Sequence, residues 1–189
     1  MKFPAYLLSC LLLCPAVALA SDPFNYDYVE LGYQHLSPQT GGSEHGPNLD
    51  FSYTVYNALQ VVGGYARLDA SAPVSSITYD NYFAGIRGES NYDDNTDFVT
   101  DILYINNHSS YQGIGNTDSG YRLALGLRHL FTSRLEFDGS LGRNWLDQPS
   151  SDVTVGLLFN AMPWLAAGIS YTHNNEANNT TSLRLRVYF

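Results

Sequence analysis

The last nine residues, Thr181-Ser-Leu-Arg-Leu-Arg-Val-Tyr-Phe189, alternate between apolar and polar side chains. Successive side chains of an extended strand point to opposite faces. One face of this stretch therefore carries Leu183, Leu185, Val187 and Phe189, and the other carries Arg184, Arg186 and Tyr188. An apolar face opposite a charged face is typical of a strand that separates lipid from an enclosed interior. The stretch predicts a transmembrane β-barrel.

The first twenty residues have the pattern of a secretory signal peptide. Lys2 gives a short positive start, and residues 5–13 form an apolar run that is too short to span a bilayer. Ala18-Leu-Ala20 then provides a cleavage site of the small-x-small kind. We therefore expect residues 1–20 to be a cleaved signal peptide and residues 21–189 to form one domain.

Both cysteines, Cys10 and Cys14, lie inside this segment, so the processed chain has no disulfide framework. A lipoprotein signal at either cysteine is the disfavoured alternative. Cys10 has almost no hydrophobic core before it, and a bulky leucine precedes Cys14.

The composition after residue 20 excludes one class of function. This part of the chain has eight arginines, no lysine and 18 acidic residues, which gives a net charge of −10. A net-acidic protein is a poor partner for nucleic acid. No apolar stretch long enough for a membrane helix remains, but each barrel strand needs only about ten residues of alternating character.

Ten alternating segments can be placed along the chain. They cover residues 28–36, 48–57, 59–68, 80–90, 96–106, 119–131, 134–145, 152–160, 164–173 and 181–189. The connections alternate in length. Compact ones lie at 57–58, 91–95, 132–133 and 161–163, and longer polar ones lie at 37–47, 69–79, 107–118, 146–151 and 174–180. Short turns at one end and long loops at the other indicate an all-β, antiparallel, up-and-down barrel of ten strands, with eight strands as the alternative.

The alternation also assigns the faces of the strands. The predicted interior carries six acids and five arginines, namely Glu30, Asp50, Glu89, Asp101, Glu136, Asp138, Arg87, Arg122, Arg128, Arg184 and Arg186. The segment 59–68 stays unassigned, because Val61-Val-Gly-Gly64 breaks its alternation. Aromatic residues gather near both ends of the strands, as expected for two belts at two membrane interfaces. We expect Phe24, Tyr26 and Tyr28 to belong to the belt at the short-turn end.

Several strand patterns carry a family resemblance, namely 26–33, 61–65, 121–128 and the terminal Tyr188-Phe189. The whole processed chain resembles the small outer-membrane β-barrel proteins of Gram-negative bacteria, of the opacity-porin and OmpX-like kind. The resemblance implies that Leu183, Leu185, Val187, Tyr188 and Phe189 form the C-terminal signal for assembly, read by the barrel-assembly machinery after periplasmic chaperones have delivered the chain. Members of this kind act as adhesins, envelope-integrity factors or narrow porins.

Charge balance favours a closed interior. Arginines that pair with carboxylates can cross-link the wall from within, and six acids against five arginines is close to neutral. A selective pore usually has a lumen with an excess of charge of one sign, and this interior is nearly balanced. An ion-selective constriction is the alternative interpretation. Near the long-loop rim, Arg67 and Arg143 are candidates for contact with lipid phosphate. We expect the acids Glu44, Asp69, Asp118, Asp147, Asp152 and Glu176 to lie outside the interior, in loops or at strand ends on that side.

The sequence contains no spacing that points to catalysis. The candidates are His108-Ser-Ser110, His173 with Glu176, and Glu44-His45, and none matches a mechanism. The sequence thus predicts a non-enzymatic outer-membrane protein without cofactor or metal, with outer-membrane lipopolysaccharide as its lipid partner. The expected role is in envelope structure or in surface interaction through short acidic loops. A narrow porin-like channel is the alternative, and a lipid-modifying enzyme at the rim is a weaker one.

Overall fold

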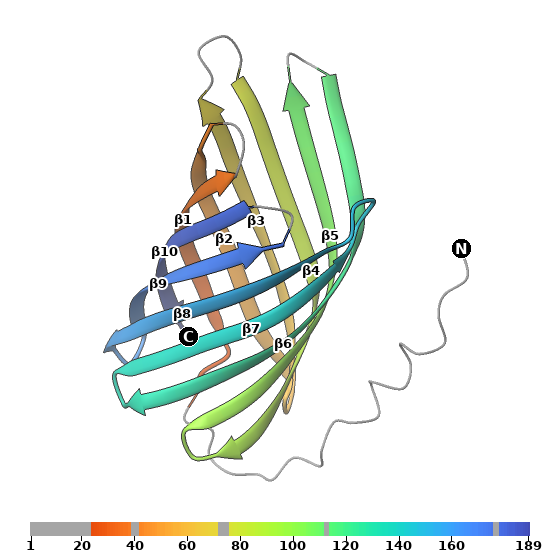
Figure 1. Ribbon diagram of the computed structural model, residues 1–189. Helices are drawn as coiled ribbons and strands as arrows, with labels where there is room; N and C mark the ends of the chain where they lie inside the picture. Colours follow the sequence, from red (N-terminus) through yellow and green to blue (C-terminus); the bar gives the residue numbers. More distant parts are fainter. Residues whose placement is uncertain (1–23, 39–41, 72–75, 112–113, 176–177) are drawn as a thin grey trace, which may run out of the picture.

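The computed structural model describes residues 24–38, 42–71, 76–111, 114–175 and 178–189. These residues form one closed barrel of ten strands (Figure 1). The strands are β1 (Tyr28–Pro38), β2 (Glu44–Tyr56), β3 (Leu59–Ser71), β4 (Ser76–Asp93), β5 (Thr96–Tyr111), β6 (Ile114–Thr132), β7 (Leu135–Trp145), β8 (Ser150–Met162), β9 (Leu165–Asn174) and β10 (Asn178–Tyr188). The predicted signal peptide lies outside the described residues. No helix in the described ranges is long and apolar enough to cross a membrane.

Each strand pairs antiparallel with its neighbours in sequence, and β1 pairs with β10 to close the ring. The closing register runs from Tyr28 opposite Tyr188 to Pro38 opposite Asn178. The prediction of ten strands in an up-and-down meander is confirmed, and the eight-stranded alternative is wrong. Closure leaves no edge strand unpaired around the ring, which is the condition for a sheet to cross a bilayer.

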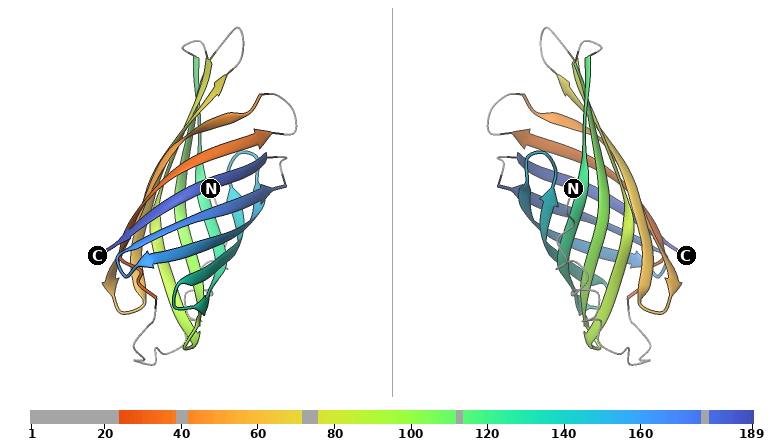
Figure 2. Two further views of the ribbon diagram at one scale, coloured as in Figure 1. Left: turned by 90° about the vertical axis from the view of Figure 1, so that its left-hand side faces the viewer. Right: turned by 90° about the vertical axis from the view of Figure 1, so that its right-hand side faces the viewer.

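The short connections lie together at one end of the barrel. Asn57 has a φ of 41° in the two-residue link between β2 and β3, a conformation that asparagine tolerates better than most residues. At the opposite end, two predicted loops are wrong, because most of residues 69–79 and 107–118 belongs to strands. β4, β5 and β6 have 18, 16 and 19 residues and rise beyond the other strands (Figures 1 and 2).

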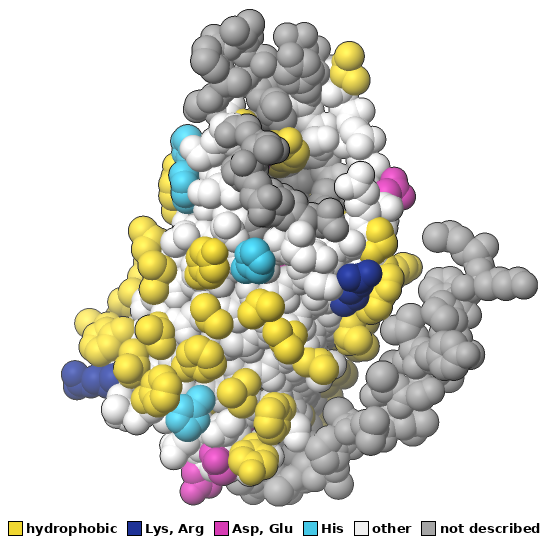
Figure 3. Space-filling view, viewed as in Figure 1, with side chains coloured by type: hydrophobic (Ala, Val, Ile, Leu, Met, Phe, Trp, Pro, Cys, Tyr) yellow, Lys and Arg dark blue, Asp and Glu magenta, His cyan; other side chains and the backbone are white. Residues whose placement is uncertain are grey.

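The outer surface of the barrel is apolar. Leu31, Leu125, Leu141 and Leu183 point outward and are 56%, 60%, 63% and 62% exposed. Figure 3 shows hydrophobic side chains spread over one face, with the few visible charged side chains toward its margins. So large a continuous apolar surface is far beyond what a soluble monomer exposes, whereas it suits contact with lipid.

The structure also resolves the facing of β3. Val61 lies opposite Tyr53 and is 39% exposed, whereas Val62 is only 3% exposed. Val61 therefore faces outward and Val62 faces inward, and the alternation continues through the two glycines.

The apolar outer face of β10 provides the first testable prediction. Leu185 is outward-facing and 44% exposed. We expect Leu185→Arg to lower the free energy of unfolding in a lipid bilayer by about 2–4 kcal/mol, because it places a charge in hydrocarbon. Urea titration, with the folded fraction read from the mobility of the unboiled protein on gels, measures the change. Leu185→Met is the matched control and should unfold like the parent. Equal stability of both variants would show that this face does not contact lipid.

Candidate functional site in the barrel interior

The alternation of the strands places the predicted charged residues inside the barrel. Nine of them line one central cavity of about 280 Å³: Glu30, Asp50, Arg87, Asp101, Arg122, Arg128, Asp138, Arg184 and Arg186. The other two lie beside them. Glu136 is 2% exposed and contacts Arg128, and Glu89 accepts a hydrogen bond from Gln60 (2.9 Å).

Every one of these five arginines forms an ion pair with a carboxylate. The nitrogen–oxygen distances are 2.7 Å for Arg87–Asp101, 2.5 Å for Arg122–Asp152, 2.7 Å for Arg128–Glu136, 2.6 Å for Arg184–Asp138 and 2.8 Å for Arg186–Glu30. The Arg87 pair is bidentate, since its Nη2 also donates to Asp101 over 3.0 Å. Short charge-assisted bonds of this kind tie the strands together from within.

Two of the pairs span more than one strand spacing. Arg184 on β10 reaches Asp138 on β7, across both β9 and β8, and Arg122 on β6 reaches Asp152 on β8, across β7. Such links brace the wall over a greater width than a backbone ladder between adjacent strands.

Glycines lie directly beneath these two long links. A Cβ on Gly156 would lie 2.4 Å from Arg184 Nη2 and 2.6 Å from Asp138 Oδ1. A Cβ on Gly142 would lie 2.5 Å from Arg122 Nη2 and 2.7 Å from Asp152 Oδ1. The absence of a side chain therefore lets the Arg184–Asp138 pair pass over β8 at Gly156 and the Arg122–Asp152 pair pass over β7 at Gly142.

The segment before β1 enters the short-turn end of the barrel. Phe24 and Tyr26 are 6% and 4% exposed and pack with Val99. The Tyr26 hydroxyl donates to Asp97 over 2.8 Å. The guanidinium carbon of Arg128 lies 4.8 Å from the centroid of the Phe24 ring and 4.5 Å from that of Tyr26. These are cation–π distances, so aromatic rings and a buried ion pair together fill this end.

A second buried cluster adjoins the first. Tyr28, Leu158, Ala166 and Tyr188 pack together, and the Arg186 guanidinium lies 4.0 Å from the centroid of the Tyr28 ring. The expectation that Phe24, Tyr26 and Tyr28 belong to an outer aromatic belt is therefore wrong. Tyr28 follows the inward phase of β1, and the other two precede the strand, where alternation carries no information.

The charge inventory also differs from the prediction. Asp152 is 7% exposed and pairs with Arg122, so its expected place outside the interior is wrong. Asp97, which the sequence did not single out, is completely buried. Both fit the inward phase of their strands, and they lie at the ends of the predicted segments 152–160 and 96–106, so the alternation applied over the full segments would have found them. With these two, the central network contains eight acids and five arginines, and Glu44 and Asp118 share the inward phase of β2 and β6 nearer the rim.

Of the other acids expected outside the interior, Glu44, Asp69 and Asp118 lie within β2, β3 and β6, Asp147 follows β7, and Glu176 is outside the described residues.

A second cavity of about 370 Å³ lies toward the long-loop end. It shares Val62, Phe83, Arg87, Asp101 and Arg122 with the central cavity, so the two adjoin. Apolar Leu103 and Ile105 line one part of it, and Asn144 and Ser150 line another. The interior is thus filled at the short-turn end and hollow toward the long loops.

Comparison with known proteins supports the architecture. No family model and no curated protein matches the sequence. Among solved structures, the KdgM porin is similar over 85% of this chain and 99% of its own, with 12% identity and a TM-score of 0.50. The corresponding values are 86%, 96%, 16% and 0.50 for Neisserial surface protein A, and 85%, 98%, 11% and 0.52 for the NanC porin. The chain has the fold of the small outer-membrane β-barrels. The predicted resemblance is confirmed at that level.

The two rim arginines of this outer-membrane fold lie on its outer wall near the long-loop end. Arg67 Nε is 3.8 Å from Asp69 Oδ1, with both side chains about half exposed. Arg143 donates to the Ser151 hydroxyl over 2.8 Å. At the other end of the barrel, the backbone N–H of Phe189 donates to the Asp27 carbonyl over 3.1 Å.

The candidate catalytic groups do not converge in the described residues. His108 contacts the Thr117 hydroxyl (2.9 Å), and Ser109 follows it on the opposite face of β5. His173 contacts Asn179 Oδ1 (2.7 Å), and Glu176 lies outside the described residues. His45 lies beside the Tyr33 ring on the outer wall.

The glycine beneath the longest link provides a second prediction. Gly156→Ala should separate Arg184 from Asp138, and we expect it to lower the free energy of unfolding by about 1–3 kcal/mol through overpacking. Gly88→Ala is the matched control, because nothing lies within 4 Å of the position its Cβ would take. Urea unfolding in the same lipid compares the two. A Gly156 variant as stable as the Gly88 variant would contradict the bridging role of this pair.

Proposed function

We propose that the protein is an integral outer-membrane β-barrel with a closed interior, and that it acts in envelope structure or surface interaction. Transport and catalysis are not its role in this proposal. The observation that carries it is the filled short-turn end, where Arg128 and Glu136 are 5% and 2% exposed beneath Phe24 and Tyr26. Buried charges need such partners, because an unpaired one costs several kcal/mol.

The membrane location is supported by the outward leucines and by the fold of the similar structures. The proposal includes export by the signal peptide at residues 1–20. It also includes assembly through the terminal strand, whose outward residues Leu183, Leu185 and Val187 present an apolar face. The non-enzymatic role rests on the dispersed positions of the histidines.

One observation favours the second candidate, a narrow porin-like channel. The eight acids and five arginines of the central network leave the lumen biased to one sign, which is the condition for ion selectivity. The two adjoining cavities provide part of a path. Conduction through that path requires movement of Phe24, Tyr26 and the Arg128–Glu136 ion pair that these rings cover.

Conductance in planar bilayers separates the two proposals. For the full chain in its processed form we expect no discrete current steps. Phe24→Ala combined with Tyr26→Ala should produce brief small steps, because Arg128 then loses both rings that cover it. Phe131→Ala is the matched control, since this ring is 59% exposed on the outer wall near the same end, and it should stay silent. Regular, reproducible steps in the parent protein would refute the closed interior and support the channel.

A further inference from the structure

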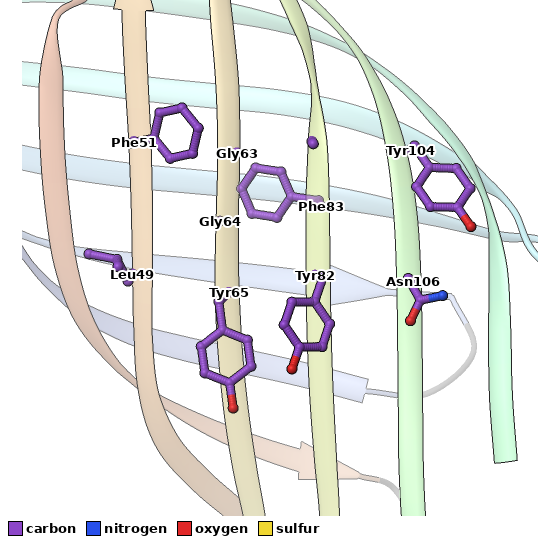
Figure 4. Close-up of a pocket in the computed structure, with 10 residues that line it drawn as sticks. Leu49, Phe51, Gly63, Gly64, Tyr65, Tyr82, Phe83, Tyr104 and Asn106 are labelled. Carbon is purple, nitrogen blue, oxygen red and sulfur yellow. The ribbon is translucent and has the colours of Figure 1, made fainter. Parts of the chain in front are cut away.

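The outer wall of the barrel carries a hollow across β2 to β5. Its volume is about 350 Å³, and its lining is almost wholly apolar. The hollow forms beside Ala84, which has a small side chain on the outward face. Its cross-strand partner Gly63 has no side chain and is covered by the Phe51 ring, since a Cβ on Gly63 would lie 2.6 Å from Phe51 Cε1. Leu49 and Phe51 of β2 border it on one side (Figure 4).

Two glycines of β3 leave the backbone without side chains behind this hollow. Gly63 and Gly64 are consecutive in β3, and a Cβ on Gly64 would lie 2.4 Å from the inward ring of Phe83. In Figure 4 the Phe83 ring overlaps β3 at these two glycines. Behind the hollow, on the inner face of the sheet, the Phe83 ring therefore packs against the backbone at Gly64.

Polar groups gather only at the long-loop end of the hollow. Tyr65, Tyr82 and Tyr104 extend toward that end, with the Asn106 amide beside them (Figure 4). The Tyr65 and Tyr82 ring centroids are 4.8 Å apart, and the Tyr65 hydroxyl donates to Asp80 over 2.6 Å. The Tyr82 and Tyr104 hydroxyls and the amide thus provide hydrogen-bond donors where the apolar lining stops.

A cation lies beyond the tyrosines. Arg67 is two residues further along β3 than Tyr65 and opposite Asp80 on β4. Its side chain is 51% exposed, and its 3.8 Å contact with Asp69 is too long for a hydrogen bond. Along the wall toward the long-loop end, the order is therefore the apolar hollow, the neutral hydrogen-bond donors and then the guanidinium group.

We propose that this hollow binds one acyl chain of a lipopolysaccharide molecule in the outer leaflet. The acyl chain lies over Ala84 and against the Phe51 ring, its ester or amide carbonyl accepts hydrogen bonds from Tyr82 or Asn106, and a phosphate reaches Arg67. A guanidinium is suited to phosphate oxygens. The site lies on the wall that faces lipid, and its polar edge, with Arg67 beyond it, lies toward the long-loop end, so the lipid of the outer leaflet is its occupant.

The inference rests on the proposed outer-membrane location and orientation, and it adds a specific lipid site to them. Ala84→Phe fills the hollow with an apolar ring. Ala167→Phe is the matched control, because Ala167 is also outward-facing and exposed but lies on β9, away from the hollow. Both variants keep the surface apolar, so a difference between them reports the hollow and not general hydrophobicity.

Native mass spectrometry of the purified, delipidated full chain in detergent, titrated with lipopolysaccharide, measures binding. We expect one bound molecule for the parent and for Ala167→Phe, and at least tenfold weaker binding for Ala84→Phe. Arg67→Ala should weaken binding of the phosphorylated lipid and leave binding of its dephosphorylated form unchanged. Ala84→Leu replaces the phenylalanine variant if the latter fails to give the gel mobility of the folded protein.

Equal binding by the parent and the filled variant would overturn the site. Binding of phosphatidylethanolamine as tightly as lipopolysaccharide, with the same loss in Ala84→Phe, would overturn lipopolysaccharide as the occupant. Failure of the proposed function is a separate result. In that case the parent protein would show no difference in gel mobility with and without boiling and would be recovered as a soluble protein.

Discussion

Ion pairing between arginine and carboxylate inside the barrel is the interaction on which the rest of the structure depends. Charges enclosed by a β-wall that faces lipid lose most of their water, and each is stable there only with an opposite partner and further hydrogen bonds. Each of the five arginines has a carboxylate partner, at nitrogen–oxygen distances of 2.5 to 2.8 Å. Within the described residues the two Nη atoms of Arg128 make no hydrogen bond, and its guanidinium lies against the Phe24 and Tyr26 rings instead. The pairs explain how a narrow ten-stranded barrel is filled without an apolar core of ordinary size.

The same constraint connects the sequence to the proposed function. Pairs between adjacent strands follow from register, as Glu30 lies opposite Arg186. Pairs that cross a strand need space, which Gly142 and Gly156 provide. Aromatic rings cover the buried Arg128 pair at one end, whereas the interior is hollow at the other. The described part of the barrel is therefore filled toward its short turns and hollow toward its long-loop end.

Much of this arrangement could be predicted from the sequence, because a strand has a period of two whatever its neighbours are. That period gave the ten strands and the inward position of residues such as Arg122 and Asp138. It could not place Phe24 and Tyr26, which lie outside the strands. It also missed the upper parts of β4 to β6, where the alternation of apolar outward and polar inward side chains does not continue. The role of Gly142 and Gly156 beneath the ion pairs depends on contacts across several strands, which the period of one strand does not predict.

The most direct test of the account is a double-mutant cycle on Arg184 and Asp138, which are linked across two intervening strands. The variants Arg184→Asp, Asp138→Arg and their combination are compared by urea unfolding in lipid. We expect each single change to lower the free energy of unfolding by about 3–5 kcal/mol, since it leaves like charges buried together. The exchanged pair should recover at least half of the summed loss. Additive losses, with no recovery in the exchanged pair, would contradict an interior held closed by paired charges.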